Sequence, residues 1–253
     1  MLALLALAVA WSPKAAARTQ VEEVLQELFV SEAVYPQDEA ELQLSNSVQY
    51  ERADRRDQLS LVPRSEYGIT DWVQVELEMP LLATRHAGLG AAQGLGNVEL
   101  GLMANPVNSR RAGFALSLGV EATLPTASET VDDATSGLGA FVVFYGVLGP
   151  LHANTYLALE GERSAESDSE PELEPYAALG LFAPVGTLVP SLEVAIGQAD
   201  EVLMVTLAAG LTVRVHPDVE VGAAALIDAR SPRVRGGVLQ ATLEFGGAEP
   251  EDD

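Results

Sequence analysis

Apolar residues alternate one by one with polar or small residues over long stretches of this 253-residue chain. From Phe114 to Leu124, the apolar residues share one face, and Ser117, Glu121 and Thr123 lie on the other. Successive side chains of a β-strand point to opposite faces, so period two is typical of a strand with two different faces. Residues 73–79, 98–103 and 203–215 repeat the pattern, and helical spacing fits none of these windows. The sequence therefore predicts an all-β fold.

Gly, Pro, Asn and Asp clusters divide the chain into segments of about ten residues or more. A tilted strand needs about 9–11 residues to cross a bilayer, whereas strands of soluble sheets are most often about 5–6 residues long. Closure into a barrel leaves no unpaired edge in lipid. We predict an antiparallel transmembrane β-barrel of about twelve strands, near residues 40–52, 57–69, 71–82, 96–105, 112–124, 138–148, 151–161, 173–183, 188–198, 201–215, 218–228 and 233–246.

The charge of the chain indicates which face is wet. The chain has 14 Lys+Arg against 37 Asp+Glu, a net charge of −23. A soluble barrel would expose basic as well as acidic residues, and few basic residues are present. We therefore expect the apolar faces to meet lipid and the carboxylates to line an aqueous lumen. A soluble β-sandwich alternates in the same way and is the competing interpretation, against which strand length argues. The acidic charge also argues against a nucleic-acid partner.

The inward faces of the predicted strands carry many carboxylates and few cations. If the lumen conducts, such a lining favours cations, because negative side chains lower the barrier for positive solutes. Alternatively, these side chains hydrogen-bond one another and fill a narrow barrel. Both interpretations stay open at this stage. The predicted lumen-lining residues are Arg64, Glu66, Glu76, Glu78, Glu99, Glu121, Tyr156, Glu160, Glu193, Arg214, Glu220 and Glu244.

Both ends of the chain differ from the barrel region, residues 39–246. Residues 1–17 begin with an apolar run and end in small residues, as a signal peptide does; a buried core helix is the alternative. Residues 18–38 form an N-terminal segment in which Thr19–Phe29 has helical spacing. This segment is expected either as a plug in the barrel mouth or as a periplasmic contact. Residues 247–253 are predicted to be an acidic, disordered tail.

Several stretches of hairpin sequence resemble one family of bacterial outer-membrane barrels. Ser65–Pro80, Gly94–Leu102 and Val120–Thr126 are similar to the proteins known as transporter-like or phenol-degradation meta-pathway proteins. Leu28–Pro36, which leads into Glu39–Gln43, is similar to the short segment before the first strand in that group. The resemblance implies a barrel in the outer membrane. It names no substrate, because its motifs are hairpin signatures.

Aromatic residues near the predicted strand ends are candidates for the interfacial girdles of such a barrel. Outer-membrane strands commonly finish the chain on an aromatic residue, and here the last strand is expected to end at Phe245. The candidates are Tyr50, Tyr67, Trp72, Tyr145, Tyr156 and Phe245.

The sequence offers few candidates for catalysis or cofactor binding. Gly88–Gly94 is rich in glycine, but a strand follows it where a dinucleotide-binding loop would open a helix, so we predict a flexible hairpin loop. The histidines His86, His152 and His216 lack the spacing of a metal pair. We expect no cofactor and no metal site.

Two further features leave weak alternatives. His152 and Asn154 share a strand face, which invites comparison with barrel lipases, but no serine can be placed beside them. Asp132, Asp133 and residues 166–174 form acidic loops without a defined ligand register.

We therefore predict a channel or transporter for small solutes in the outer membrane, without enzymatic activity. The expected partners are membrane lipid and lipopolysaccharide, a small solute and the barrel-insertion machinery. The alternatives are a closed structural or adhesion barrel that contacts lipopolysaccharide through its acidic loops and, less favoured, a membrane lipid hydrolase.

Overall fold

The computed structural model describes residues 24–52, 56–86, 90–109, 112–128, 130–164, 171–199, 202–230 and 233–246. These residues form strands and connections without a helix, so none of them belongs to a helix able to span a membrane. The predicted signal peptide (1–17) and acidic tail (247–253) lie outside them. The strands are β1 (Leu42–Arg52), β2 (Arg56–Thr70), β3 (Val73–Glu78), β4 (Leu81–His86), β5 (Gly90–Leu95), β6 (Val98–Ser109), β7 (Phe114–Leu124), β8 (Thr135–Leu148), β9 (Leu151–Ser164), β10 (Glu172–Phe182), β11 (Leu188–Ala199), β12 (Val202–His216), β13 (Val219–Asp228) and β14 (Arg233–Phe245).

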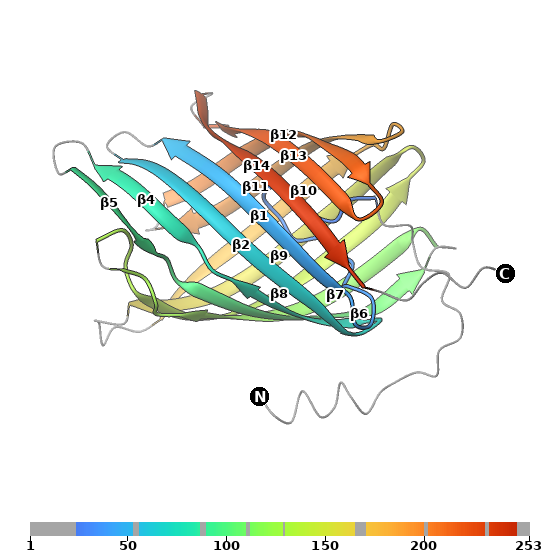
Figure 1. Cartoon of the computed structure of the whole chain (residues 1–253), viewed down its shortest axis with the longest axis horizontal. Helices are drawn as coiled ribbons and strands as arrows, with labels where there is room; N and C mark the ends of the chain where they lie inside the picture. The colour runs from blue at the N-terminus through green and yellow to red at the C-terminus, as the bar shows by residue number, and fades with distance from the viewer. Residues whose placement is uncertain are drawn as a thin grey trace.

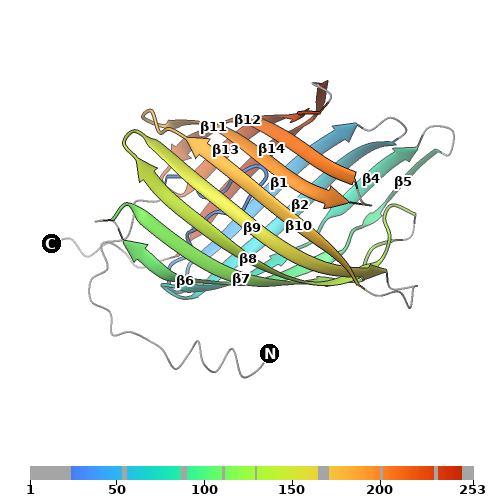
Figure 2. The same cartoon turned by 180° about the vertical axis from the view of Figure 1, so that it is seen from behind.

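The strands pair antiparallel with their neighbours and close into a barrel (Figures 1 and 2). Closure occurs at β1, which pairs with β14 on one side and with β2 on the other. β3 and β4 both pair with β2, one after the other, so together they form one strand of the wall. β6 pairs with β3 and β5 pairs with β4, so β5 and β6 together form the next strand of the wall. The wall therefore has twelve strands, which confirms the predicted barrel.

The interruption between β3 and β4 falls at Pro80, which has no N–H to donate to a neighbouring strand. The hydrogen bonding continues around it. Met79 N–H donates to the Pro63 carbonyl at 3.1 Å, and Gly96 N–H donates to the Pro80 carbonyl at 2.8 Å. The backbone groups that flank the break thus stay bonded, as a wall in lipid requires.

The two faces of the wall differ as the alternation predicts. Apolar side chains in mid-strand are exposed on the outside, for example Leu118 at 49% and Val120 at 51%. Polar neighbours point into the barrel, where Ser117 and Glu193 are completely buried. This arrangement, apolar outside and polar inside, is that of a membrane barrel and not of a soluble one.

The two ends of the barrel differ in their connections. Leu42 pairs with Phe245, so β1 begins and β14 ends at the same end of the barrel, here called the terminal end. Tight turns, such as residues 71–72, 149–150 and 217–218, join strands at this end. The opposite end, here called the loop end, carries the two longest connections, residues 125–134 and 165–171.

Two sequence predictions need correction here. The predicted flexible loop Gly88–Gly94 is mostly strand, because residues from Gly90 onward form β5 and pair with β4; residues 87–89 lie outside the described part. Gly94 lies against the connection that follows β7, where a Cβ would meet the Ser128 side chain at 2.6 Å. A small residue was therefore needed for close packing and not for a flexible loop.

The helical prediction for Thr19–Phe29 also needs correction within the described residues. Residues 24–29 are irregular, since their backbone N–H groups bond carboxylates of the wall, as shown below, and not carbonyls of a helix. Residues 19–23 lie outside the described part.

Five of the six aromatic candidates separate into two groups, and Trp72, in the turn between β2 and β3, is half-buried. Tyr50, Tyr67 and Phe245 are exposed near strand ends, as expected of interfacial residues. Tyr145 and Tyr156 instead point inward and are buried, at 2% and 7% exposure. They belong to the interior of the barrel and were wrongly considered for a girdle.

A charge on the outer face tests the membrane contact. Leu118→Arg, in the middle of β7, is expected to lower the free energy of folding into lipid vesicles by about 2–4 kcal/mol, because the guanidinium would lie in hydrocarbon. Leu148→Arg at the rim is the control, with an expected cost of about 0–1 kcal/mol. Urea titration, read from the different gel migration of folded and boiled protein, measures both. Equal costs at the two positions would contradict the membrane placement.

Candidate functional site

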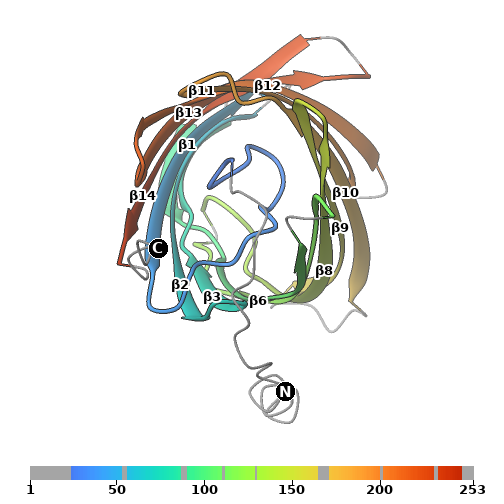
Figure 3. The same cartoon turned by 90° about the vertical axis from the view of Figure 1, so that its right-hand side faces the viewer.

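Residues 24–37, here called the luminal segment, run inside the barrel before the chain enters β1 (Figure 3). Carboxylates of the wall accept its backbone N–H groups. Glu193 on β11 accepts from the N–H groups of Phe29 at 2.9 Å and Val30 at 3.1 Å, and from the Ser31 hydroxyl at 3.2 Å. Glu220 on β13 accepts from the Gln26 N–H at 3.1 Å. These charged hydrogen bonds replace the helical bonds that the segment lacks.

The wall is also shaped to receive the segment. The Phe29 ring lies against Gly210 on β12 and Gly222 on β13, where a Cβ would approach ring atoms to 2.3 Å and 2.9 Å. Tyr176 on β10 donates a hydrogen bond to the Val30 carbonyl at 2.5 Å. Asn154 on β9 donates to the Glu32 carbonyl at 2.9 Å. The luminal segment is thus bound by several strands around the barrel.

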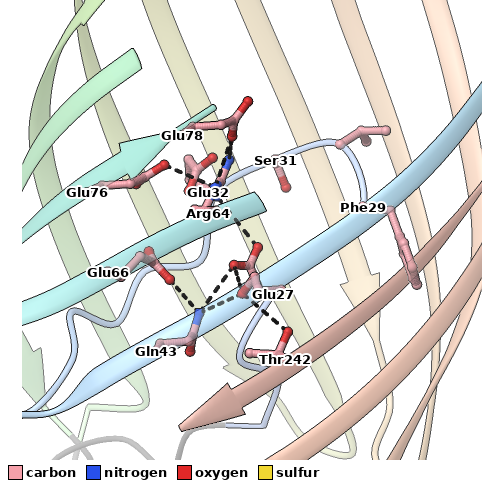
Figure 4. A network of polar contacts seen from close by, with 12 residues as sticks. Glu27, Phe29, Ser31, Glu32, Gln43, Arg64, Glu66, Glu76, Glu78 and Thr242 are labelled. Atoms are coloured by element: carbon pink, nitrogen blue, oxygen red, sulfur yellow. Dashed lines mark hydrogen bonds and ion pairs between the residues drawn. The ribbon is translucent and has the colours of Figure 1, made fainter. Parts of the chain in front are cut away.

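Arg64 on β2 connects the luminal segment to the wall (Figure 4). Its guanidinium lies 3.0 Å from Glu32 and 3.5 Å from Glu27, both in the luminal segment. On β3 it lies 3.1 Å from Glu76 and 2.8 Å from Glu78. Burial raises the pKa of the Glu27 carboxyl, and the nearby Arg64 guanidinium opposes that shift. One arginine therefore holds four carboxylates together.

Glu66, beside this cluster, is held by amides. Gln74 donates to one of its oxygens at 2.8 Å, and Gln43 donates to the other. Among the described residues, Glu32, Glu66 and Glu76 form one group with the spacing of a cation site, since one carboxylate oxygen from each lies within 4.8 Å of the others. Arg64 lies within 3.1 Å of two members of this group and supplies positive charge there.

Apolar side chains fill the lumen toward the terminal end. Val24, Leu25 and Leu28 of the luminal segment pack with inward residues of the wall, including Phe141 and Tyr145 on β8. The signal in the sequence is the run from Phe141 to Tyr145, which is apolar on both faces and so indicates burial on both sides. The prediction that carboxylates line an aqueous lumen did not include this apolar cluster.

His152 belongs to the same apolar region. Its Nδ1 atom bonds the Tyr145 hydroxyl, and its ring stacks on Phe182 with centroids 5.5 Å apart. Asn154, which shares its face, is engaged by the luminal segment. Both side chains therefore have packing and anchoring contacts, and the pair needs no catalytic explanation.

Toward the loop end, the lumen contains a cavity of about 530 Å³, here called the vestibule. Its inner boundary is the luminal segment from Glu27 to Glu32, and its outer boundary includes the exposed residues Glu51 and Gln198 near the loop-end limits of β1 and β11. Tyr156 and Tyr176 form part of its wall. The vestibule is thus a space with a mixed polar and apolar lining that opens at one end and is bounded by the luminal segment at the other.

The structure gives each predicted lumen residue a place. Arg64, Glu78, Glu121, Tyr156 and Glu160 line the vestibule. Glu76 lies in the Arg64 cluster and Glu66 lies beside it, and the register sets Glu99 opposite Glu78. Glu193 and Glu220 anchor the luminal segment. Arg214 pairs with Glu220 at 3.1 Å and donates to the Val24 carbonyl at 2.9 Å, and Glu244 contacts the Gln26 side chain.

Sequence reasoning missed Glu27 and Glu32. Both precede the first strand, so strand periodicity could not indicate that they lie in the lumen. Gln43 and Gln74 were also missed, although their positions on inward faces of alternating segments carried the signal.

Comparison with solved structures places the fold among bacterial outer-membrane barrels. The COG4313 outer-membrane channel from Pseudomonas putida F1 superposes with a TM-score of 0.66 and 13% identity, over 84% of this chain and 98% of that one. A KdgM porin in complex with disordered oligogalacturonate gives 0.50 and 7% identity, over 83% and 100%. No family model matches the chain, and no curated protein matches it either. The predicted outer-membrane β-barrel is confirmed at the level of the fold.

Removal of the Glu193 carboxylate tests the anchoring of the luminal segment. Glu193→Ala leaves three donors without their acceptor, and a hydrogen bond to a charged group contributes about 1.5–3 kcal/mol. Deuterium exchange in residues 24–37 is expected to accelerate roughly tenfold or more. Glu160→Gln is the control, because that luminal carboxylate bonds Thr123 of the wall at 2.9 Å. The anchoring role is wrong if exchange is the same in both variants.

Proposed function

We propose that this protein is an outer-membrane channel for small solutes and that its lumen favours cations. The loop end faces outward and the terminal end faces the periplasm, because outer-membrane barrels have short periplasmic turns and longer external loops. The vestibule is then the external entrance. The luminal segment forms the constriction on the periplasmic side of it.

The observation that carries the proposal is the charge of the vestibule lining. The charged residues that line it, among those the structure describes, are one arginine, Arg64, and the glutamates Glu27, Glu32, Glu51, Glu78, Glu121, Glu160 and Glu174. Arg64 is already shared by the carboxylates of its cluster. The entrance therefore has an excess of negative charge, which attracts cations and repels anions.

Neutralising three of these carboxylates tests ion preference. The Glu76→Gln, Glu78→Gln and Glu121→Gln triple variant removes negative charge beside Arg64 and in the vestibule. Its cation-over-anion permeability ratio is expected to fall several-fold toward unity, measured as reversal potentials across a planar bilayer in asymmetric KCl. Glu39→Gln, at an exposed position on the terminal rim, should leave the ratio unchanged. An unchanged ratio in the triple variant would show that these carboxylates do not control permeation.

The position of the luminal segment supports a second candidate function, that of a barrel whose lumen stays closed. The segment and its apolar contacts occupy the terminal half of the lumen. Such a barrel would serve a structural or adhesive role, and contact with lipopolysaccharide through acidic loops remains a prediction for it. The two candidates differ in whether displacement of the segment yields an ion-conducting path.

A bulky residue beneath Phe29 distinguishes the candidates. In Gly210→Val the new side chain occupies the place of the Phe29 ring, so the luminal segment should be displaced and single-channel conductance should rise at least twofold. Gly180→Ala is the matched control, because its Cβ would meet Glu193 at 3.4 Å and Leu28 at 3.8 Å, which are ordinary contacts. If the wild type and Gly210→Val both insert into the bilayer and neither conducts ions, the protein is a closed barrel and not a channel.

A further inference from the structure

We propose that the vestibule binds small organic cations, with an ammonium group between Glu121 and Glu160 and an apolar body against Tyr156 and Tyr176. The inference deepens the proposed function, because it names the class of solute that the entrance would recognise. It rests on a cavity, a pair of carboxylates separated by a glycine, and a tyrosine hydroxyl that is accessible from the cavity.

The two glutamates lie on either side of a glycine in the wall. Glu121 on β7 pairs with Gly139 on β8, and Gly139 pairs with Glu160 on β9, so the three residues lie in one row across three neighbouring strands. A Cβ at Gly139 would lie 3.7 Å from the nearest atoms of both glutamates. The nearest atoms are a carboxylate oxygen of Glu121 and the Cβ of Glu160, whose carboxylate extends toward Gly137. Gly139 lines the vestibule beside both side chains.

Aromatic surface adjoins this row. Tyr156 lies on β9 with Glu160, and its ring packs against Phe141 and Tyr176 with centroids 5.4 Å and 5.8 Å away. Tyr156 and Tyr176 both line the vestibule. Aromatic faces attract cations and also accept apolar groups, which suits an amine with a hydrocarbon body.

Tyr156 adds an independent indication of a ligand. Its side chain is mostly buried, at 7% exposure, and its hydroxyl bonds no described residue but stays accessible from the vestibule. The Tyr176 hydroxyl, by contrast, donates a hydrogen bond to the Val30 carbonyl. A hydroxyl placed in this way can donate to, or accept from, a polar group of a solute in the vestibule.

The size and charge of the vestibule fit such a solute. A volume of about 530 Å³ lies within the range of about 300–1,000 Å³ typical of small-molecule sites. Glu121 and Glu160 are separate from the Arg64 ion pairs, and Glu160 bonds the Thr123 hydroxyl at 2.9 Å. Glu160 also bonds the Glu162 side chain. Among the described residues, neither Glu121 nor Glu160 forms an ion pair with a cationic side chain.

Binding is tested on the folded full chain by isothermal titration with 2-phenylethylammonium. Its isostere 2-phenylethanol lacks the charge, and phenylacetate reverses it. We expect the ammonium to bind at least tenfold more tightly than the alcohol and the anion to show no binding. Equal binding of the ammonium and the alcohol would overturn the proposal.

Three variants locate the site. The Glu121→Gln, Glu160→Gln double variant should weaken ammonium binding at least tenfold, and Tyr156→Phe should weaken it two- to fivefold. Gly139→Leu fills the space beside the two glutamates without a change of charge and should abolish binding. Glu172→Gln, at an exposed position near the loop end, is the control. If folded Gly139→Leu and folded Tyr156→Phe both bind 2-phenylethylammonium with wild-type affinity, the proposed site is wrong. This result would be decisive even if the double variant failed to fold.

Titration needs no ion flow, so it separates this inference from the channel proposal. Ammonium binding by a barrel that is silent in planar bilayers would uphold the site and refute conduction. Conduction with a cation preference but without ammonium binding would uphold the channel and refute the site.

Discussion

Lipid offers no hydrogen-bond partner, so every N–H and C=O group of a membrane wall has to be bonded within the protein. In this chain the requirement is met by pairing β1 with both β14 and β2, and by bonds that continue past Pro80 where β3 gives way to β4. Closure has a second consequence. Because the outer face must be apolar, the polar residues of each alternating strand are directed into a confined interior, where their charges must be balanced or hydrated.

The luminal segment supplies part of that balance. Its backbone N–H groups bond Glu193 and Glu220, and Glu220 also pairs with Arg214 of the wall. Its own acidic residues, Glu27 and Glu32, reach Arg64 and share it with the wall. The segment and the wall therefore depend on each other: the wall bonds the segment, and the segment divides the lumen into an apolar, filled half and an acidic, open half.

This division explains how a channel and a binding site can occupy one barrel. The filled half restricts passage, and the open half presents carboxylates and tyrosines to the outside. A solute recognised in the vestibule would be held next to the luminal segment, the element whose displacement we expect to open the path. Recognition and permeation would then occur in sequence along one axis, with Glu121 and Tyr156 before the constriction and Phe29 at it.

Strand periodicity, together with segment length and net charge, predicted the barrel, about twelve strands and most of the inward residues, because side-chain direction in a strand depends on local alternation. Resemblance to outer-membrane hairpins agreed with that reading at the level of the fold. The same local signal could not place residues 24–37, whose bonds to Glu193 and Glu220 span more than 160 positions of the chain. It also could not separate inward residues that anchor the segment from those that line open space. Only the tertiary structure decided these points, because they depend on which side chains meet across the lumen once the barrel has closed.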